Sequence, residues 1–240
     1  MVGKALTLQL AREGHEVTAI YRSQWPEEFI EYENISPAKG DIQDKDFLEK
    51  SFVGLDGVFH VAAFAKPWTQ DKSTYYNINE IGTKNVAEAC VKNGVKRLVY
   101  TSSAGIHGAQ QNGNLIDEST WPVEYFTDYE QSKFNGRNEA LSFMSDQLEV
   151  VIVSPARVYA PGKVSESNVP ARMISIYLNK KVGVAAASGK GIGSYAFIDD
   201  IVHGHILAMT KGVSGEEYLL GGDNKNYIEF FGILAELTGK

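Results

Sequence analysis

Several features that would assign a protein to a large class are missing from this sequence. Its 240 residues include one cysteine, Cys90, which cannot form a disulfide within the chain and favours a reducing compartment. No apolar run approaches the roughly 18 residues that a membrane span needs. No charged and then apolar leader precedes a cleavage site, so we expect no signal peptide and a cytoplasmic protein.

Charge and metal-ligating residues exclude two further classes. The net charge is −7 and no basic run is present, which argues against a nucleic-acid-binding protein. His203 and His205 are two residues apart on a predicted helix and therefore diverge, so they make a poor metal pair. We expect no metal site.

Short apolar runs alternate with amphipathic segments along the first 160 residues. Near-continuous apolar runs predict buried strands, and longer segments with helical periodicity predict helices. The expected strands are 16–21, 57–62, 97–101 and 149–153, and the expected helices are 4–13, 46–52, 74–92, 128–144 and 169–179. This alternation predicts an α/β fold with a Rossmann-like, doubly wound parallel sheet and helices on both faces.

The regularity weakens after about residue 160, which predicts a division of the chain. Residues 1–160 are expected to form a nucleotide-binding domain. Residues 161–240 are expected to form mainly a small, irregular and partial substrate-binding lobe. A segment near 194–222 is expected to return to the main sheet.

The start of the chain lacks an element that a doubly wound nucleotide-binding domain normally has. Such a domain opens with a strand and a glycine-rich turn before its first helix. Here Met1-Val2-Gly3 leads directly into a helix, and only Gly3 could be a glycine of that turn. We expect a truncated chain, with a natural variant as the alternative, and the helix at 230–240 suggests a cut end as well. The strand in question lies mid-sheet, so its two neighbours should each keep one unpaired edge.

The most informative residues are Tyr129 and Lys133, on the expected helix 128–144, together with Ser103 after the strand 97–101. Four residues are close to one helical turn, so Tyr129 and Lys133 project from the same face. A phenol has a reference pKa near 10, and a neighbouring ammonium favours the phenolate. A serine hydroxyl can hold a carbonyl oxygen beside that phenol. The set is suited to exchange a proton at a carbonyl or carbinol oxygen while a cofactor moves a hydride.

The motifs together resemble a known family. The chain resembles the extended short-chain dehydrogenases/reductases, the NAD-dependent epimerase/dehydratase superfamily, over essentially all of its length. Each motif is short, but their order and spacing are specific: Gly40-Asp41-Ile42, His60-Val61-Ala62-Ala63, Asn79-Glu80-Ile81-Gly82-Thr83, Thr101-Ser102-Ser103-Ala104-Gly105, Tyr129-x-x-x-Lys133, the run from Pro155 to Gly162, and Phe197-Ile198-Asp199-Asp200. Residues 197–208 are similar to the 3β-hydroxysteroid dehydrogenase branch, and residues 101–105 to the dihydroflavonol-4-reductase branch.

The resemblance implies a role for each matching residue. The implied catalytic residues are Ser103, Tyr129 and Lys133, with Asn79 bracing the active site. The implied cofactor-binding residues are Gly3, Asp41, Ile42, Val61, Ala62, Ala63, Thr101, Tyr129, Lys133, Pro155 and Val158. The candidate substrate-contacting residues are Phe64, Trp68, Gly105 and His107. The long helices 74–92 and 128–144 are expected to pair across a two-fold axis in a homodimer, as they do in many members of the family.

Arg22 decides the expected coenzyme. It follows the strand that ends at Tyr21, where NAD-specific members usually place an acidic residue for the ribose 2′-hydroxyl. A guanidinium at that place suits a 2′-phosphate. We therefore expect NADP(H) in preference to NAD(H), with NAD(H) still possible.

Three functions remain open at this point. The leading one is an NADP(H)-dependent reductase of a ketone or aldehyde, or a dehydrogenase of a secondary alcohol, acting on a small and largely apolar substrate. A second is a nucleotide-sugar epimerase or dehydratase that uses NAD. The diphosphate-binding asparagine and arginine of such enzymes are not found at 154–157 and 193–195, although Arg157 could compensate. A third is a non-catalytic dinucleotide-binding or interaction protein.

Overall fold

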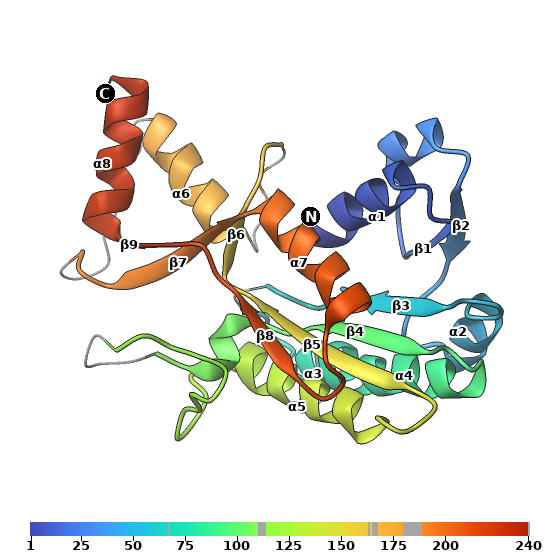
Figure 1. The fold of residues 1–240 in the computed structure, drawn as a ribbon. Coiled ribbons are helices and arrows are strands. Elements are labelled where there is room, and N and C mark those ends of the chain that lie inside the picture. Colours follow the sequence, from blue (N-terminus) through green and yellow to red (C-terminus); the bar gives the residue numbers. More distant parts are fainter. Residues whose placement is uncertain (67, 110–113, 163, 165–167, 180–188, 240) are drawn as a thin grey trace.

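The fold is seen in a computed structural model that describes residues 1–66, 68–109, 114–162, 164, 168–179 and 189–239 (Figure 1). Its main sheet has four parallel strands in the order β3–β4–β5–β8. These strands are β3 (Gly57–His60), β4 (Arg97–Thr101), β5 (Glu149–Pro155) and β8 (Glu217–Leu220). The register sets Thr101 of β4 beside Val153 of β5. The strand β8 lies within the segment 194–222.

Helices cover both faces of this sheet, as the sequence predicts (Figure 1). On one face lie α4 (Gly82–Lys92) and α5 (Asp128–Ser142), and on the other lies α7 (Ile198–Lys211). Both faces are therefore apolar, and Leu98, Val99 and Tyr100 in the middle of β4 are fully buried. The helix α1 (Val2–Arg12) packs against α7, and the short α2 (Lys45–Ser51) packs against α4.

A second, two-stranded sheet stands apart from the first. Its parallel strands are β1 (Val17–Tyr21) and β2 (Ile35–Lys39). The 3₁₀ turn η1 (Glu27–Glu31) lies between them in the sequence. In the described part of the chain β1 pairs only with β2, and β3 pairs only with β4. The prediction that two strands each keep an unpaired edge is confirmed.

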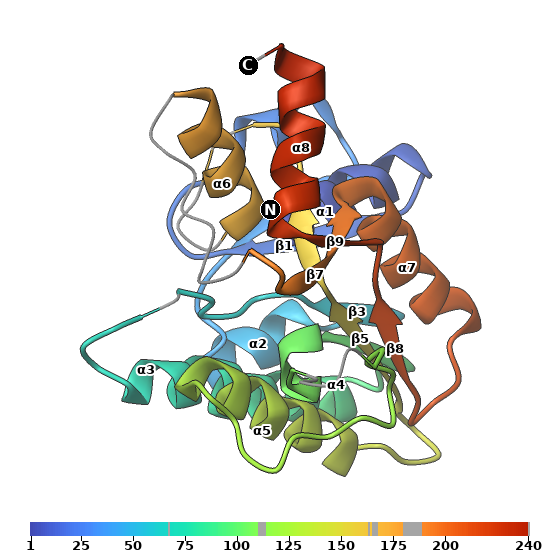
Figure 2. The ribbon, with the colours of Figure 1, turned by 90° about the vertical axis from the view of Figure 1, so that its left-hand side faces the viewer.

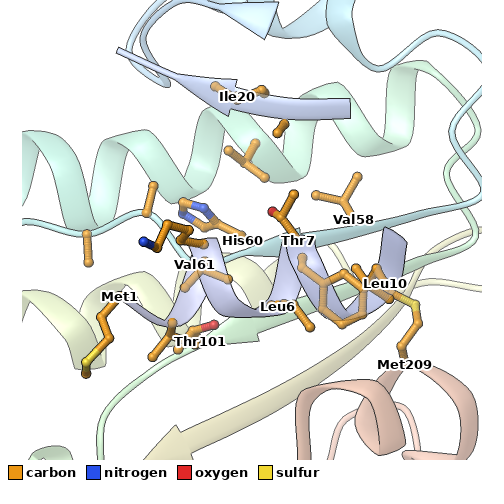
Figure 3. A pocket seen from close by; sticks show the side chains of 18 of the residues that line it. Met1, Leu6, Thr7, Leu10, Ile20, Val58, His60, Val61, Thr101 and Met209 are labelled. Atoms are coloured by element: carbon orange, nitrogen blue, oxygen red, sulfur yellow. The ribbon is translucent and has the colours of Figure 1, made fainter. Parts of the chain in front are cut away.

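A cavity of about 1640 Å³ separates the two unpaired edges and continues to the carboxyl ends of the main strands. Figure 3 shows Ile20 of β1 on one side and Val58 and His60 of β3 on the other, with Thr7 of α1 drawn near the two β3 residues. The lining along this stretch is mostly apolar. The cavity positions the candidate site, because its lining includes Ser103, Tyr129 and Lys133.

The later part of the chain builds a third sheet beside the main one (Figure 2). It contains β6 (Arg157–Tyr159), β7 (Ile192–Phe197) and β9 (Asp223–Asn226), with β7 in the middle. The helices α6 (Val169–Leu178) and α8 (Tyr227–Thr238) lie side by side above it, and the rings of Tyr177 and Phe231 stack between them. No helix in the described ranges is long and apolar enough to cross a membrane.

The predicted helix 74–92 is one continuous helical segment with a local widening. It consists of α3 (Ser73–Tyr76), the π-helical turn η2 (Asn77–Ile81) and α4. A π turn inserts an extra residue into the helical ladder and is frequent at functional sites. It places Asn79, which is fully buried, toward α5.

Candidate active site

The start of helix α5 fixes the position of Tyr129. Thr127 caps the helix by accepting a hydrogen bond from the backbone N–H of Glu130 at 3.1 Å. The carboxylate of Glu130 accepts in return from the backbone N–H of Thr127 at 3.2 Å. This reciprocal capping box satisfies two N–H groups that a helix start otherwise leaves free. Tyr129 is therefore held in the first turn of α5, and Lys133 one turn later.

Glycine at position 136 lets α5 approach the rest of the site closely. A Cβ atom placed there would lie 2.1 Å from the backbone oxygen of Asn79 and 2.6 Å from the hydroxyl of Tyr100. Both distances are far shorter than van der Waals contact, and the 2.1 Å approach is to backbone that cannot rotate away. Only glycine permits the observed packing of α5 on η2 and β4.

Lys133 is 1% exposed and lines the cavity. Its ammonium donates to the backbone oxygen of Thr101 at 2.7 Å and lies 4.3 Å from the ring centroid of Tyr100. No carboxylate among the described residues pairs with it. Burial lowers the pKa of Lys133 to about 7. The amine therefore changes its charge close to neutral pH.

Ser103 and Tyr129 meet at the carboxyl end of β4. The Oγ atom of Ser103 accepts from the backbone N–H of Gly105 at 3.2 Å, which caps the 3₁₀ turn η3 (Ala104–His107). Burial raises the pKa of Tyr129, and a hydrogen bond to Ser103 acts against that rise. The phenol is thus protonated at neutral pH and able to donate. Ser103, Tyr129 and Lys133 all line the cavity.

Thr101 is held by a histidine that sequence reasoning missed. His205 of α7 is buried, and its Nδ1 lies 2.7 Å from the backbone oxygen of Ile201. A carbonyl can only accept, so Nδ1 carries the proton and Nε2 is an acceptor. The hydroxyl of Thr101 therefore donates to Nε2, at 2.9 Å. Since a histidine in an apolar helix stripe has no local partner in the sequence, no pattern marks this role.

Asn79 braces the site from outside the cavity. Its amide donates to the hydroxyl of Ser132 at 3.0 Å and to the backbone oxygen of Phe64 at 3.1 Å. Its carbonyl oxygen accepts from the backbone N–H of Phe64 at 2.7 Å. Asn79 thereby ties α5 to the segment that follows β3. That arrangement is what a bracing role needs, and the role itself stays a prediction.

His60 adds a buried neutral group beside Lys133. The hydroxyl of Thr83 donates to the backbone oxygen of Asn79 at 2.7 Å, so toward His60 it must accept. The Nε2 atom of His60 lies 3.0 Å from that hydroxyl and carries the proton. Burial, followed by the nearby charge of Lys133, lowers the pKa of His60 to about 3. His60 lines the cavity as a permanently neutral side chain.

Most of the expected cofactor residues lie around the cavity. The lining includes Gly3, Ile42, Val61, Ala62, Ala63, Thr101, Tyr129, Lys133, Pro155 and Val158. Arg22 and Asp41 are not part of it. The guanidinium of Arg22 is largely exposed and lies 3.7 Å from a carboxylate oxygen of Asp41.

The residues around the cavity fit a nicotinamide dinucleotide. The small side chains of Ala62 and Ala63 leave the backbone after β3 accessible. The hydroxyl of Ser102 is buried, lines the cavity and has no hydrogen-bond partner among the described residues, so it can serve a ligand.

The expected substrate residues lie elsewhere. Trp68 is 74% exposed, and the ring of Phe64 packs edge-on against Tyr75 at 5.0 Å. Gly105 is engaged by the Ser103 cap. His107 is 1% exposed and has both ring nitrogens occupied by protein groups, so the structure does not bring it to the cavity. None of the four lines the cavity as it is formed by the described residues.

Comparisons with known proteins agree with the motifs. The model of the NAD dependent epimerase/dehydratase family matches residues 1–221. A Synechocystis sp. protein provisionally named a dihydroflavonol 4-reductase is 31% identical over 99% of this chain and 68% of its own length. The sterol-4-alpha-carboxylate 3-dehydrogenase, decarboxylating, of Bos taurus is 28% identical over 83% of this chain and 57% of its own length.

A solved structure has the same fold and contains a coenzyme. MoeE5 in complex with UDP-glucose and NAD superposes with a TM-score of 0.84 and 25% identity over 99% of this chain and 79% of its own. The Rossmann-like architecture is therefore shared with a solved protein that holds NAD. On this evidence the chain belongs to the NAD dependent epimerase/dehydratase family, whose members are NAD(P)-dependent oxidoreductases and lyases.

Proposed function

We propose that this chain is an NADP(H)-dependent oxidoreductase that reduces a ketone or aldehyde of a small, largely apolar substrate, or oxidises the matching secondary alcohol. The observation that carries the proposal is the convergence of Ser103, Tyr129 and Lys133 on one cavity. The bound coenzyme would supply or accept the hydride. The chain's own residues handle the oxygen and its proton.

The roles of the three residues follow from their hydrogen bonds. Ser103 Oγ accepts from the backbone N–H of Gly105, and its O–H, which is hydrogen-bonded to Tyr129, can also donate to a substrate oxygen that enters between them. Tyr129 is protonated at neutral pH and donates its proton as negative charge grows on that oxygen. Lys133, when charged, favours the phenolate that remains. The backbone oxygen of Thr101 holds the Lys133 amine in place for this role.

An apolar substrate is supported by the cavity wall and by the relatives. Beyond the catalytic residues the lining continues over Val158, Val169 and Pro170. One relative of 28% identity carries the name of a sterol-carboxylate dehydrogenase. Retained activity with a polar sugar ketone and none with apolar or aromatic ketones would contradict this part of the proposal.

Arg22 is our proposed determinant of the coenzyme. Its exposed guanidinium stands at the end of β1, next to Asp41, where a 2′-phosphate could replace or join the carboxylate. Hydrogen bonds to charged groups contribute about 1.5–3 kcal/mol, which corresponds to roughly 10- to 150-fold in affinity. We expect Arg22→Ala to weaken NADPH binding by about that factor and to leave NADH binding unchanged.

Calorimetric titration of both coenzymes measures the effect. Arg12→Ala is the matched control, because Arg12 is also exposed and donates only to the hydroxyl of Tyr32 in the described structure. If the ratio of the NADPH and NADH affinities is unchanged in Arg22→Ala, Arg22 is not part of the coenzyme site.

A nucleotide sugar is the second candidate substrate, and Arg157 is the observation in its favour. Arg157 lines the cavity, donates to the hydroxyl of Tyr195 at 3.1 Å and lies over the rings of Tyr195 and Tyr227. It has no carboxylate partner in the described ranges, so its charge is available to a diphosphate. Binding of UDP to the purified chain, with NAD retained through purification, would favour this candidate over the ketone reductase.

A homodimer through helices 74–92 and 128–144 is also proposed. The helices α4 and α5 pack against one another, and Ile81 of η2 and Val91 of α4 are 48% and 40% exposed. A second copy would cover such side chains. Sedimentation velocity that finds only monomer at tens of micromolar protein would exclude this dimer.

A further inference from the structure

A buried charged cluster lies behind the catalytic residues. We call it the Glu217 cluster, and it contains His107, Arg137, Ser154 and Glu217. The four residues come from η3, α5, β5 and β8, so four separate elements meet at one carboxylate. Glu217 is 7% exposed and His107 1% exposed. No step of the proposed reaction uses any of them.

Hydrogen-bond geometry defines the charges of the cluster. One carboxylate oxygen of Glu217 accepts from Nε2 of His107 at 3.0 Å and from the hydroxyl of Ser154, and the other accepts from Nε of Arg137 at 2.6 Å. The Nδ1 atom of His107 lies 2.9 Å from the backbone oxygen of Thr120, which can only accept. Both ring nitrogens of His107 therefore carry protons, and the ring is an imidazolium beside an ionised glutamate.

The electrostatics agree with that assignment. Burial acts to lower the pKa of His107, but the hydrogen bonds to Glu217 and to the Thr120 carbonyl outweigh it and raise the pKa. Burial acts to raise the pKa of Glu217, but the hydrogen bonds from His107, Ser154 and Arg137 lower it. The other titratable groups that act on the cluster are Tyr100 of β4 and Tyr125 ahead of α5, and both phenols are neutral because burial raises their pKa.

The cluster is joined to both catalytic elements. His107 ends the short turn η3 whose first cap is Ser103. Arg137 lies one helical turn after Lys133 on α5. Glu217 sits on β8, which pairs with β5 at the edge of the main sheet. The carboxylate thus fixes the Ser103 turn and the Tyr129 helix to one point.

Stability alone gives a weak reason for such a cluster. Replacing a buried ion pair by apolar residues of similar volume is often neutral or stabilising. Geometry gives a stronger reason, because charge-assisted hydrogen bonds hold their partners in fixed directions. On the basis of the proposed function, we propose that Glu217 is a positioning residue. Through His107 and Arg137 it holds Ser103 and Tyr129 at the separation needed to act on one substrate oxygen.

The test is Glu217→Gln, which keeps the size of the side chain and one acceptor oxygen but removes the charge. We expect kcat for carbonyl reduction to fall about tenfold or more while KM and coenzyme affinity change less than twofold. Hydrogen exchange of the amides of Gly105, Ile106 and Gly108, which are bonded within the Ser103 turn, should become at least tenfold faster. Hydrogen exchange needs no substrate. It therefore distinguishes a failure of Glu217 to hold the Ser103 turn from a failure of the proposed function.

Glu149→Gln is the matched control, since Glu149 also pairs with an arginine, Arg97, but lies at the other end of β5. It should change neither kcat nor exchange in the Ser103 turn. If Glu217→Gln does not fold, Arg137→Gln is the alternative, because it removes the hydrogen bond from Arg137 to Glu217 at a less buried side chain. It should likewise lower kcat and speed up hydrogen exchange in the Ser103 turn. Unchanged exchange together with unchanged kcat in the folded variant would overturn the proposal, whether or not its melting temperature falls.

Discussion

Replacing Tyr129 by phenylalanine should lower kcat for carbonyl reduction by about 10²- to 10⁴-fold, the usual contribution of a positioned general acid. The phenol is hydrogen-bonded to Ser103, and burial keeps its pKa raised. Phenylalanine preserves the ring and its edge contact with Tyr75, at 6.4 Å between centroids, so the fold of the site should remain. Coenzyme affinity should change little, and steady-state kinetics with NADPH measure the loss.

Tyr76→Phe is the matched control for this experiment. Tyr76 also carries a hydrogen-bonded hydroxyl, which donates to Asp128 at 3.1 Å, directly beside Tyr129. It lies outside the cavity lining, so its removal should leave kcat within about twofold of the wild type. Full turnover by Tyr129→Phe would end the proposed mechanism.

Lys133→Met should stabilise the protein at neutral and acidic pH while it abolishes efficient turnover. The pKa of Lys133 falls from its ordinary 10.5 to about 7 because burial disfavours the ammonium. One pKa unit corresponds to about 1.4 kcal/mol, so the burial of this charge costs several kcal/mol below pH 7. Methionine fills similar space without a charge.

The sign of the pH dependence follows from proton binding. Between about pH 7 and pH 10.5 the unfolded chain holds more protons on Lys133 than the folded chain does. The stability of the wild type therefore rises with pH across that range, and the advantage of Lys133→Met shrinks toward pH 10.5. Urea unfolding at pH 6 and at pH 10 measures the free energy of unfolding of the wild type and of Lys133→Met.

A surface lysine provides the control for this stability effect. The side chain of Lys96 is 81% exposed, so Lys96→Met should stay within about 0.5 kcal/mol of the wild type at both values of pH. An advantage of Lys133→Met that is independent of pH would show that the lysine is not buried as the structure has it. We expect Lys133→Met to gain stability and to lose activity, which is the usual relation when a strained or destabilised active-site group is replaced.

The strands β3, β4 and β5 of the main sheet were predictable because they carry their own signal. The runs at β4 and β5 are apolar on both faces, and α4, which precedes β4, has one apolar face that includes Val86, Ala89 and Cys90. The strand β2 was missed because Pro37 interrupts it and only Ile35 is buried. It forms as an edge beside β1, where a proline costs little. The short strands β6, β7 and β9 depend on partners far along the chain, which no local pattern reveals.

The candidate site was likewise predictable only where the signal is local in the sequence. Tyr129 and Lys133 were found because one helical turn joins them, and Ser103 because a strand precedes it. The partnership of His107 with Glu217 spans 110 residues and leaves no spacing to recognise. His107 was expected to contact substrate because it follows Ser103 closely, but a 3₁₀ turn directs it into the protein interior.

The most direct test of the central claim is a calorimetric titration of this chain with NADPH and, in parallel, with NADH. The account predicts saturable binding of NADPH at one site, at least tenfold tighter than that of NADH. Binding of NADPH should persist in Tyr129→Phe and weaken in Arg22→Ala. Failure of both coenzymes to bind the folded chain would contradict the claim that this cavity is a dinucleotide site.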